Sequence, residues 1–412
     1  MIDYKEHLLP NGLKLIVHED HLSPVVCLNI LYKVGSRNEN PDKTGFAHLF
    51  EHLMFGGSKN IGNFDSPLQN VGGDNNAFTS PDITNYYITI PSINVETAFW
   101  LESDRMLSLS FDPKVLEVQR KVVIEEFKQR YLNQTYGDLW LKLRPLAYKV
   151  HPYQWPTIGK EISHIENATM DDVKAFFDQF YDPSNAILVV AGDITEAKAL
   201  ALTEKWFGPI PSTKKVNGHI PVEPSQNEAR FLEIRSDVPA AAIYKAYHMP
   251  GRVGKAYHAT DLFGDILGRG KSSFLHQRFV NDLQWMSSIS AYATGSVDPG
   301  LLTISGKINE GVDIEKVDKE IEDVLHQILS GTIDEKELEK TKNQAESAIV
   351  FGETEVLNRA MGLAYASFLG NTGLVNDELA IVQSVTKEDV LDAGKQVMKS
   401  TNCSTVYYIP KN

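Results

Sequence analysis

The feature that most limits the fold of this chain is an internal duplication, which appears when the sequence is shifted against itself. Residues 169–190 fall on residues 386–407 without a gap at a shift of 217 positions, and Thr169 meets Thr386. In each copy this Thr is followed three positions later by Asp, the pattern of a capped helix N-terminus, and then by a helical segment and a β-rich run. The two ends therefore predict the same helix–strand unit twice.

The same shift also aligns the beginnings of the two copies. Residues 13–17 fall on residues 230–234, and residues 25–31 fall on residues 242–248. Both pairs of segments are predicted to form two consecutive strands followed by a helix. Because one shift aligns both ends of two halves, we infer a true duplication.

The duplication predicts two homologous domains, at residues 1–208 and 226–412, joined by a linker at residues 209–225. We expect the linker because this stretch is rich in Pro, Gly and polar residues and has no hydrophobic periodicity. Each half mixes strands and helices without a regular alternation of the two. The expected fold class is therefore α+β, with helices packed on a mixed or antiparallel sheet in each domain.

Composition excludes several classes of protein. Hydrophobic residues make up 42% and charged residues 23% of the 412 residues, as in ordinary globular proteins. The net charge is −14 and no basic stripe is present, so nucleic acid is not expected as a partner. The two cysteines, Cys27 and Cys403, form no disulfide framework and suit a reducing compartment.

The sequence also contains no recognisable targeting or membrane segment. No apolar run follows a basic start at the N-terminus, and no stretch approaches the roughly 18 apolar residues of a membrane span. We therefore expect no signal peptide, no membrane partner and a cytoplasmic location.

The sharpest chemical feature is the motif His48-Leu-Phe-Glu51-His52, which lies in an apolar segment predicted to be helical. Positions i and i+4 project from the same side of a helix, so both imidazoles can bind one tetrahedral zinc ion. Glu51 flanks the same face and can accept a proton from water near the metal. The alternative is a helix whose histidines only satisfy packing, but three polar groups among apolar neighbours would be costly to bury without a role.

A catalytic zinc site needs a third protein ligand, and a following helix offers Glu117, Glu125 and Glu126. Glu125 and Glu126 are separated by about 100° around a helix, so only one of them can face the metal. Neighbouring apolar residues such as Val123 and Phe127 make Glu126 plausible as the inward-facing residue. Glu125 is then the surface alternative, and composition does not decide between them.

Together these motifs resemble those of the pitrilysin/insulinase metallopeptidases. Residues 48–52 are similar to the inverted zinc motif of that family. Residues 54–58 (MFGGS), 72–79 (GGDNNAFT), 122–126 (VVIEE) and 151–153 (HPY) are similar to its further motifs. The resemblance covers essentially the whole chain. It is strongest to the short, two-domain bacterial members, which are related to mitochondrial processing peptidase.

The resemblance implies a zinc-dependent endopeptidase that hydrolyses peptides or unfolded segments inside a clamshell chamber, with one zinc ion per chain. His48 and His52 correspond to the family's zinc histidines, and Glu51 to its general base. Glu126, rather than Glu125, falls at the position of the family's third ligand.

Three further residues take an implied role from the resemblance. Asn76 and Ala77 fall on the strand that pairs with the substrate backbone in the family, which fits peptide binding by strand addition. Without the resemblance they would be interpreted as an ordinary strand end. Gln119 stands seven residues before Glu126, where the family often has a second glutamate. A glutamine there can hydrogen-bond but adds no charge.

The second half departs from the family pattern. Val280 and Ser287 occupy the positions where many active members carry an Arg and a Tyr that contact the substrate or its tetrahedral intermediate. Neither residue can supply a strong partner for an oxyanion. This half also has no zinc motif, because the shift of 217 places Asp265 against His48 and Arg269 against His52.

These departures predict a partner. Family members work as four such domains, whereas this chain has two, so a dimer is implied. The absent Arg and Tyr favour a heterodimer in which a homologous subunit supplies that pair, and a homodimer is the second possibility. A non-catalytic, metal-stabilised scaffold or assembly subunit is the alternative function.

Overall fold

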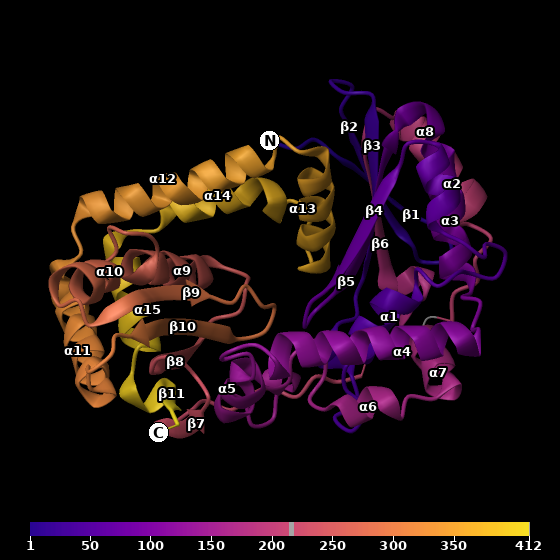
Figure 1. Cartoon of the computed structure of the whole chain (residues 1–412). Coiled ribbons are helices and arrows are strands. Elements are labelled where there is room, and N and C mark those ends of the chain that lie inside the picture. Colours follow the sequence, from indigo (N-terminus) through magenta and orange to yellow (C-terminus); the bar gives the residue numbers. More distant parts are fainter. Residues whose placement is uncertain (214–217, 412) are drawn as a thin grey trace. The chain divides into compact units, whose positions relative to one another are not determined.

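The computed structural model describes residues 1–213 and 218–411, and it contains two sheets whose strand orders match except for one additional edge strand in the first (Figure 1). The first sheet has the order β1-β2-β6-β3-β5-β4 and the second has the order β7-β11-β8-β10-β9. The strands of the first sheet are β1 (Lys5–Leu8), β2 (Lys14–Glu19), β3 (Val25–Tyr32), β4 (Asp74–Thr79), β5 (Thr84–Pro91) and β6 (Ala186–Gly192). Those of the second are β7 (Arg230–Ser236), β8 (Ala242–Met249), β9 (Met286–Ala293), β10 (Gly300–Ile308) and β11 (Cys403–Pro410).

Apart from β1, each strand of the first sheet has a counterpart at the same place in the second. Each sheet has a single parallel pair, β2 with β6 and β7 with β11, and its other pairs are antiparallel. The bounds of β3, moved by 217 residues, are those of β8. The expected α+β class and the duplication are confirmed.

The predicted helix caps are present in both copies. Helix α7 (Met170–Phe180) begins after Thr169, whose hydroxyl accepts from the N–H of Asp172, and α15 (Lys387–Val397) begins after Thr386 in the same way. The bounds of α7 also become those of α15 at the shift of 217. Such capping boxes satisfy N–H groups that have no partner inside the helix.

Two helices are exchanged between the halves. Helix α5 (Leu139–Ala147) packs on β7, β8 and β11 of the second sheet, and α13 (Val356–Phe368) packs on β3 and β6 of the first. The two helices correspond under the shift of 217. Figure 1 shows α13 in orange beside the dark strands of the first sheet. Each half therefore covers one face of the other half's sheet.

The exchange makes both compact units discontinuous. The first unit contains Met1–Gln129, Trp155–Ile220 and Val350–Asp377, and the second contains Arg130–Gln154, Pro221–Ile349 and Glu378–Asn412. These units differ from the predicted halves, 1–208 and 226–412, by the two exchanged segments. In the predicted linker, residues 214–217 lie outside the described residues, and its described part contains no helix or strand.

Apolar burial explains why α13 stays on the first sheet. Ala360, Leu363 and Ala364 of α13 are fully buried against strand residues such as Val189 of β6. Strand β6 is buried along its whole length, which requires cover on both faces of the sheet. On the second sheet, the exchanged α5 contributes Leu143 and its neighbours to an equivalent apolar layer.

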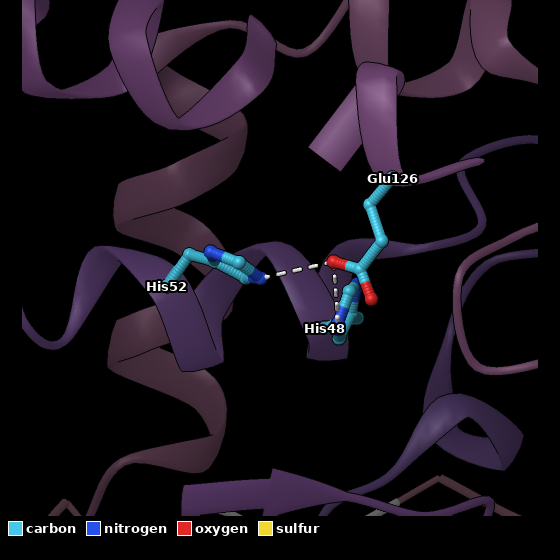
Figure 2. Close-up of side chains that lie close together, drawn as sticks. All are labelled: His48, His52 and Glu126. Carbon is cyan, nitrogen blue, oxygen red and sulfur yellow. Dashed lines mark ion pairs between the residues drawn. The ribbon is translucent and has the colours of Figure 1, made fainter. Parts of the chain in front are cut away.

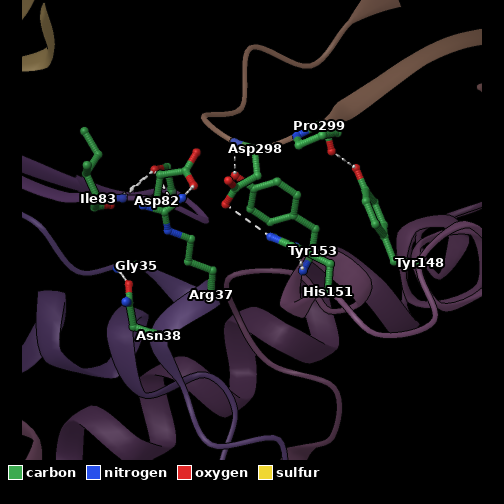
Figure 3. A network of polar contacts seen from close by, with 11 residues as sticks. Gly35, Arg37, Asn38, Asp82, Ile83, Tyr148, His151, Tyr153, Asp298 and Pro299 are labelled. Carbon is green, nitrogen blue, oxygen red and sulfur yellow. Dashed lines mark hydrogen bonds and ion pairs between the residues drawn. The ribbon is translucent and has the colours of Figure 1, made fainter. Parts of the chain in front are cut away.

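The exchanged segment that contains α5 is also held by polar contacts within the second unit (Figure 3). His151 Nε2 lies 3.2 Å from Asp298 Oδ2, and the hydroxyl of Tyr153 accepts from the N–H of Asp298 at 3.2 Å. The hydroxyl of Tyr148 donates to the carbonyl of Pro299 at 3.0 Å. The His-Pro-Tyr motif thus anchors this segment to the loop between β9 and β10.

The remaining helices complete the layers around the sheets. In the first unit they are α1 (Phe46–Leu53), α2 (Asp65–Asn70), α3 (Val95–Leu107), α4 (Pro113–Phe127), α6 (Ile162–Glu166), α7 and α8 (Glu196–Trp206). In the second unit they are α9 (Lys255–Gly268), α10 (Phe274–His276), α11 (Ile314–Gln327), α12 (Glu335–Gly352, whose last residues join the first unit), α14 (Leu374–Ser384, mostly in this unit) and α15. Among the described helices, none has the length and apolar character needed to cross a membrane.

Candidate metal centre

Helix α1 carries the predicted zinc motif, and a buried carboxylate fixes the start of this helix. Glu39 accepts from the backbone N–H groups of Gly45 at 2.9 Å and Ala47 at 2.8 Å, and from Trp155 Nε1 at 3.1 Å. Burial raises the pKa of Glu39 to about 8, although these donors act in the opposite direction. Glu39 was not predicted from the sequence, where its position shortly before a predicted helix was the only signal.

Gly45 allows the sharp entry into α1. Its φ is +89°, in the left-handed region that glycine adopts without strain. A Cβ at this position would lie 2.5 Å from the carbonyl oxygen of Ile158. The chain can therefore turn into α1 against a neighbouring loop only with glycine here.

The two sides of α1 differ in polarity. Leu49, Phe50 and other apolar residues point into the core and are fully buried. His48 and His52 lie on the other side, with side-chain exposures of 14% and 24%. This segregation keeps the imidazoles accessible from solvent while the helix is anchored by its apolar side.

Helix α4 brings one carboxylate to the two imidazoles (Figure 2). Oε2 of Glu126 lies 3.7 Å from Nε2 of His48 and 3.6 Å from Nε2 of His52. Glu125 instead pairs with Lys128, and Glu117 pairs with Arg120 and Lys121. Of the three glutamates that the sequence offered, only Glu126 thus meets the histidines.

This donor set fits a zinc ion. Two ligand atoms about 2.1 Å from a tetrahedral ion lie about 3.4 Å apart, close to the two distances from Glu126 to the histidines. Potential ligand atoms of His48, His52 and Glu126 all lie within 4.8 Å of one another. Among the described residues this is the one group of three or more His, Cys, Asp or Glu with such geometry.

Glu51 is held beside this triad by a strand residue. The hydroxyl of Thr79, the last residue of β4, donates to Oε2 of Glu51 at 2.6 Å. Behind Glu51, the hydroxyls of Tyr86 and Tyr181 lie 3.0 Å apart. Burial raises the pKa of both tyrosines, and the negative charge of Glu51 adds to the effect. In the sequence Thr79 is only the last residue of the motif at residues 72–79, and no local pattern predicts its contact with Glu51.

Strand β4 is an edge strand, and it contains Asn76 and Ala77. Asn76 is paired with Tyr87 and Ala77 with Tyr86 on β5, while no described strand of the sheet pairs with the other side of β4. The side chain of Asn76 accepts from the N–H of Ala77 at 2.8 Å. Ala77 and Thr79 share one face because side chains alternate along a strand. The hydrogen bond from Thr79 thus links this edge strand to Glu51.

Three other predicted positions are not members of this cluster. Gln119 is half-buried on α4, two helical turns before Glu126. Val280 packs against the apolar core of the second unit. Ser287 is exposed on β9, where its hydroxyl lies 3.5 Å from the carbonyl of Lys307.

The corresponding place in the second unit carries different side chains. Asp265 and Arg269, the counterparts of His48 and His52, form an ion pair at 2.8 Å. Gly268, the counterpart of Glu51, lies so close to β9 that a Cβ would stand 2.1 Å from the backbone nitrogen of Ala291. A glutamate therefore cannot replace this glycine without moving the strand.

Comparisons with known proteins agree with this difference between the halves. A family model described as "Insulinase (Peptidase family M16)" matches residues 14–154, and one described as "Peptidase M16 inactive domain" matches residues 167–345. The first match contains the histidine motif and Glu126. The second contains most of the half that lacks them.

Individual relatives were found by sequence and by structure. The zinc protease PqqE of Helicobacter pylori is 31% identical over 410 residues, covering 98% of this chain and 92% of that protein. The crystal structure of a protease from Helicobacter pylori has a TM-score of 0.94 and 30% identity over the whole of both chains. Pitrilysin shares the fold, with a TM-score of 0.78 and 17% identity; all of this chain matches 45% of pitrilysin.

Proposed function

The chain belongs to the insulinase family of peptidases, family M16, and from this premise we propose that it is a zinc-dependent endopeptidase. Its substrates are peptides or unfolded segments, which it hydrolyses within a clamshell chamber as the metal-bearing subunit of a dimer. The observation that carries the proposal is the convergence of His48, His52 and Glu126, with Glu51 beside them on the same helix.

Separate residues are proposed to bind the metal, to transfer the proton and to orient the general base. His48, His52 and Glu126 would hold the zinc ion. When bound, zinc would supply a Lewis acid that polarises the scissile carbonyl and makes water more acidic. The carboxylate of Glu51 accepts a proton from the attacking water and delivers it to the leaving amine. The hydroxyl of Thr79 keeps the Glu51 carboxylate in one orientation.

The edge of β4 is proposed to bind the substrate. An extended peptide can add to this edge through main-chain hydrogen bonds, which depend little on the peptide's sequence. Asn76 and Ala77 would make these contacts, and the Asn76 side chain must release the N–H of Ala77 before a peptide can take it. Ala77 is two residues before Thr79, whose hydroxyl contacts Glu51. A peptide added beside Ala77 would therefore have its scissile bond near Glu51.

A homologous partner subunit is part of the proposal. One metal cluster was found among the described residues, and the whole chain corresponds in fold to slightly less than half of pitrilysin. Val280 and Ser287 stand at the two positions where the family's Arg and Tyr would contact the reacting carbonyl. A heterodimer would supply the remaining domains, and its second subunit would contribute the Arg and the Tyr. A homodimer with other donors to the reacting carbonyl is the second choice.

Peptide digestion tests this function. The purified chain, loaded with zinc, is incubated with a mixture of unstructured peptides, with and without a homologous subunit that has the Arg/Tyr pair but no zinc motif. Cleavage that stops with a chelator and in Glu51→Gln is the expected result. Full-rate cleavage by the chain alone would refute the heterodimer. Stoichiometric zinc without cleavage in either mixture would instead favour the scaffold function.

A further inference from the structure

The first unit buries an ion pair on α3, next to the tyrosines behind Glu51. Glu102 and Arg105 have side-chain exposures of 0% and 1%. Nε of Arg105 donates to Oε2 of Glu102 at 2.7 Å, and its Nη2 donates to Oε1. Nη1 of Arg105 is also buried, and no described residue accepts a hydrogen bond from it. Because the lost hydration of two buried charges can exceed their attraction, stability alone does not explain this pair.

The guanidinium of Arg105 contacts aromatic rings beside the candidate metal centre. Its Cζ lies 4.5 Å from the ring centroid of Tyr86, 4.4 Å from that of Phe64 and 5.3 Å from that of Phe55. Phe55 belongs to the turn after α1, and its N–H donates to the carbonyl of His52 at 3.2 Å. These cation–π contacts therefore connect α3 with both the end of α1 and the sheet.

Tyr86 connects the sheet contact with Glu51. It shares a face of the sheet with Thr79, because its partner in β4 stands two residues before Thr79. The hydroxyls of Tyr86 and Tyr181 lie 3.0 Å apart. Burial raises the pKa of both tyrosines, the charge of Glu51 adds to this effect, and the charge of Arg105 opposes it. Glu51 and Arg105 thus act on the same two side chains.

The equivalent helix of the second unit has apolar residues in place of the ion pair. Counted from the first residue of each helix, Glu102 of α3 corresponds to Ile321 of α11, and Arg105 corresponds to Val324. Ile321 and Val324 are both buried in the core of the second unit. Because α11 packs with apolar residues at these places, the fold itself does not require charges there.

The two tyrosines have apolar counterparts as well. Leu302 of β10 stands where Tyr86 stands in β5, because their partners on β8 and β3 are equivalent at the shift of 217. At the same shift Met398 corresponds to Tyr181, and each directly follows its helix, α15 or α7. Leu302 and Met398 belong to the same apolar core as Ile321. The charges and the hydroxyls therefore occur together in the unit with the metal cluster and are replaced together in its copy.

From this comparison we infer that Arg105 is a positioning residue for peptide hydrolysis, which holds Tyr86 and Phe55 in place and thereby fixes the orientation of Glu51. Glu102 keeps the guanidinium in one orientation through two hydrogen bonds. The inference rests on the proposed function and adds to it a residue that touches neither metal nor substrate. An apolar layer packs as well, but it gives Tyr86 and the turn after α1 no such directional contact.

Replacing the ion pair by apolar residues of similar size tests the inference. The zinc-loaded full chain is assayed with a quenched fluorescent peptide, together with the homologous subunit where cleavage requires it. Glu102→Leu/Arg105→Met should keep its zinc and should be at least as stable as the wild type in chemical denaturation. Its kcat should fall by about tenfold to a hundredfold with KM unchanged, because small displacements of a catalytic group have effects of this size.

A second variant tests the route from Arg105 to Glu51. Tyr86→Leu introduces the residue that the second unit has at this place, and it should lower kcat by a similar factor. Added to the double variant, it should cause little further loss, because both changes interrupt the same contact. Losses that simply multiply would show that the two side chains act independently, and they would overturn the inference.

The second unit offers a matched control. Its Lys245 and Asp318 form a buried ion pair at 2.5 Å, with side-chain exposures of 3% and 19%. Lys245→Met/Asp318→Leu makes the same chemical change there and should leave kcat unchanged, whereas an equal loss would overturn the inference. Unchanged kcat in Glu102→Leu/Arg105→Met, beside wild-type cleavage, would overturn the inference alone. Absence of wild-type cleavage would refute the proposed function, and this inference with it.

Discussion

The end of α1 and the end of α9 occupy equivalent places beside equivalent sheets, but their surroundings differ in four side chains. The first has His48 and His52 beside Glu126, with Glu51 held by Thr79. At the second, an Asp265–Arg269 ion pair stands where the histidines would be, and Asn343 and Gly268 replace the glutamates.

This difference shows which part of the sequence maintains the fold and which part carries the chemistry. Strand order, parallel pairs and helix caps are the same in both units, and they depend on apolar periodicity and a few capping residues. The metal cluster depends on single side chains that project away from the core. A duplicated domain can therefore lose its metal without losing its fold.

The largest effect is expected for substitution of Glu51, whose counterpart in the second unit is Gly268. Glu51→Gln should lower the peptide cleavage rate by about 10²–10⁴-fold, because the amide cannot accept the proton from water. Zinc content should not change, since Glu51 is not one of the three proposed ligands. Steady-state cleavage of a quenched fluorescent peptide measures the effect. Glu125→Gln, an exposed carboxyl on α4, is the matched control; if it were as slow as Glu51→Gln, the assigned role would be wrong.

A smaller loss is expected at the residue that orients Glu51. Thr79→Val keeps the shape of the side chain but removes the hydroxyl that donates at 2.6 Å. Because a hydrogen bond to a charged group contributes about 1.5–3 kcal/mol, kcat should fall by about tenfold to a hundredfold. Thr79→Ser should restore most of the rate, because serine keeps the hydroxyl donor. Unchanged kcat in Thr79→Val would contradict the positioning role.

The counterpart of Glu51 gives a prediction about stability. Gly268→Ala should lower the free energy of unfolding by about 1–3 kcal/mol, because the new methyl would meet the backbone of β9. Chemical denaturation of the full chain measures this change. Gly352→Ala is the control, since a Cβ there has open space and should be neutral or slightly stabilising. A neutral Gly268→Ala would mean that a side chain can be accommodated at this place.

The smallest expected effect concerns a feature that both halves share. Thr169→Ala and Thr386→Ala each remove a helix cap, and each should cost about 1 kcal/mol of stability. Thermal unfolding of the two variants should show similar shifts. A shift for one variant but none for the other would show that the two helices no longer contribute equally.

Much of the fold could be predicted from the sequence because it follows from periodicity and capping. The duplication, its shift and the caps at Thr169 and Thr386 all correspond to observed elements. The exchange of α5 and α13 could not be predicted in this way. The apolar side of a helix shows that it is buried, but it does not show which of two similar sheets it covers.

The candidate site was partly foreseen for a similar reason. The spacing of His48 and His52 follows from helix geometry alone, whereas the choice of Glu126 needed either the family resemblance or the observed position of α4. Glu39, Thr79 and the crowding at Gly268 depend on contacts between segments that are distant in sequence. No local pattern in a single sequence reports such contacts.

Zinc content per chain tests the central claim most directly, namely that the first half alone holds the metal. Elemental analysis of the purified chain should find one zinc ion, which is lost in Glu126→Gln and retained in Asn343→Ala, the equivalent change in the second half. Two ions per chain, or a single ion that survives Glu126→Gln but is lost with Asn343→Ala, would contradict the account.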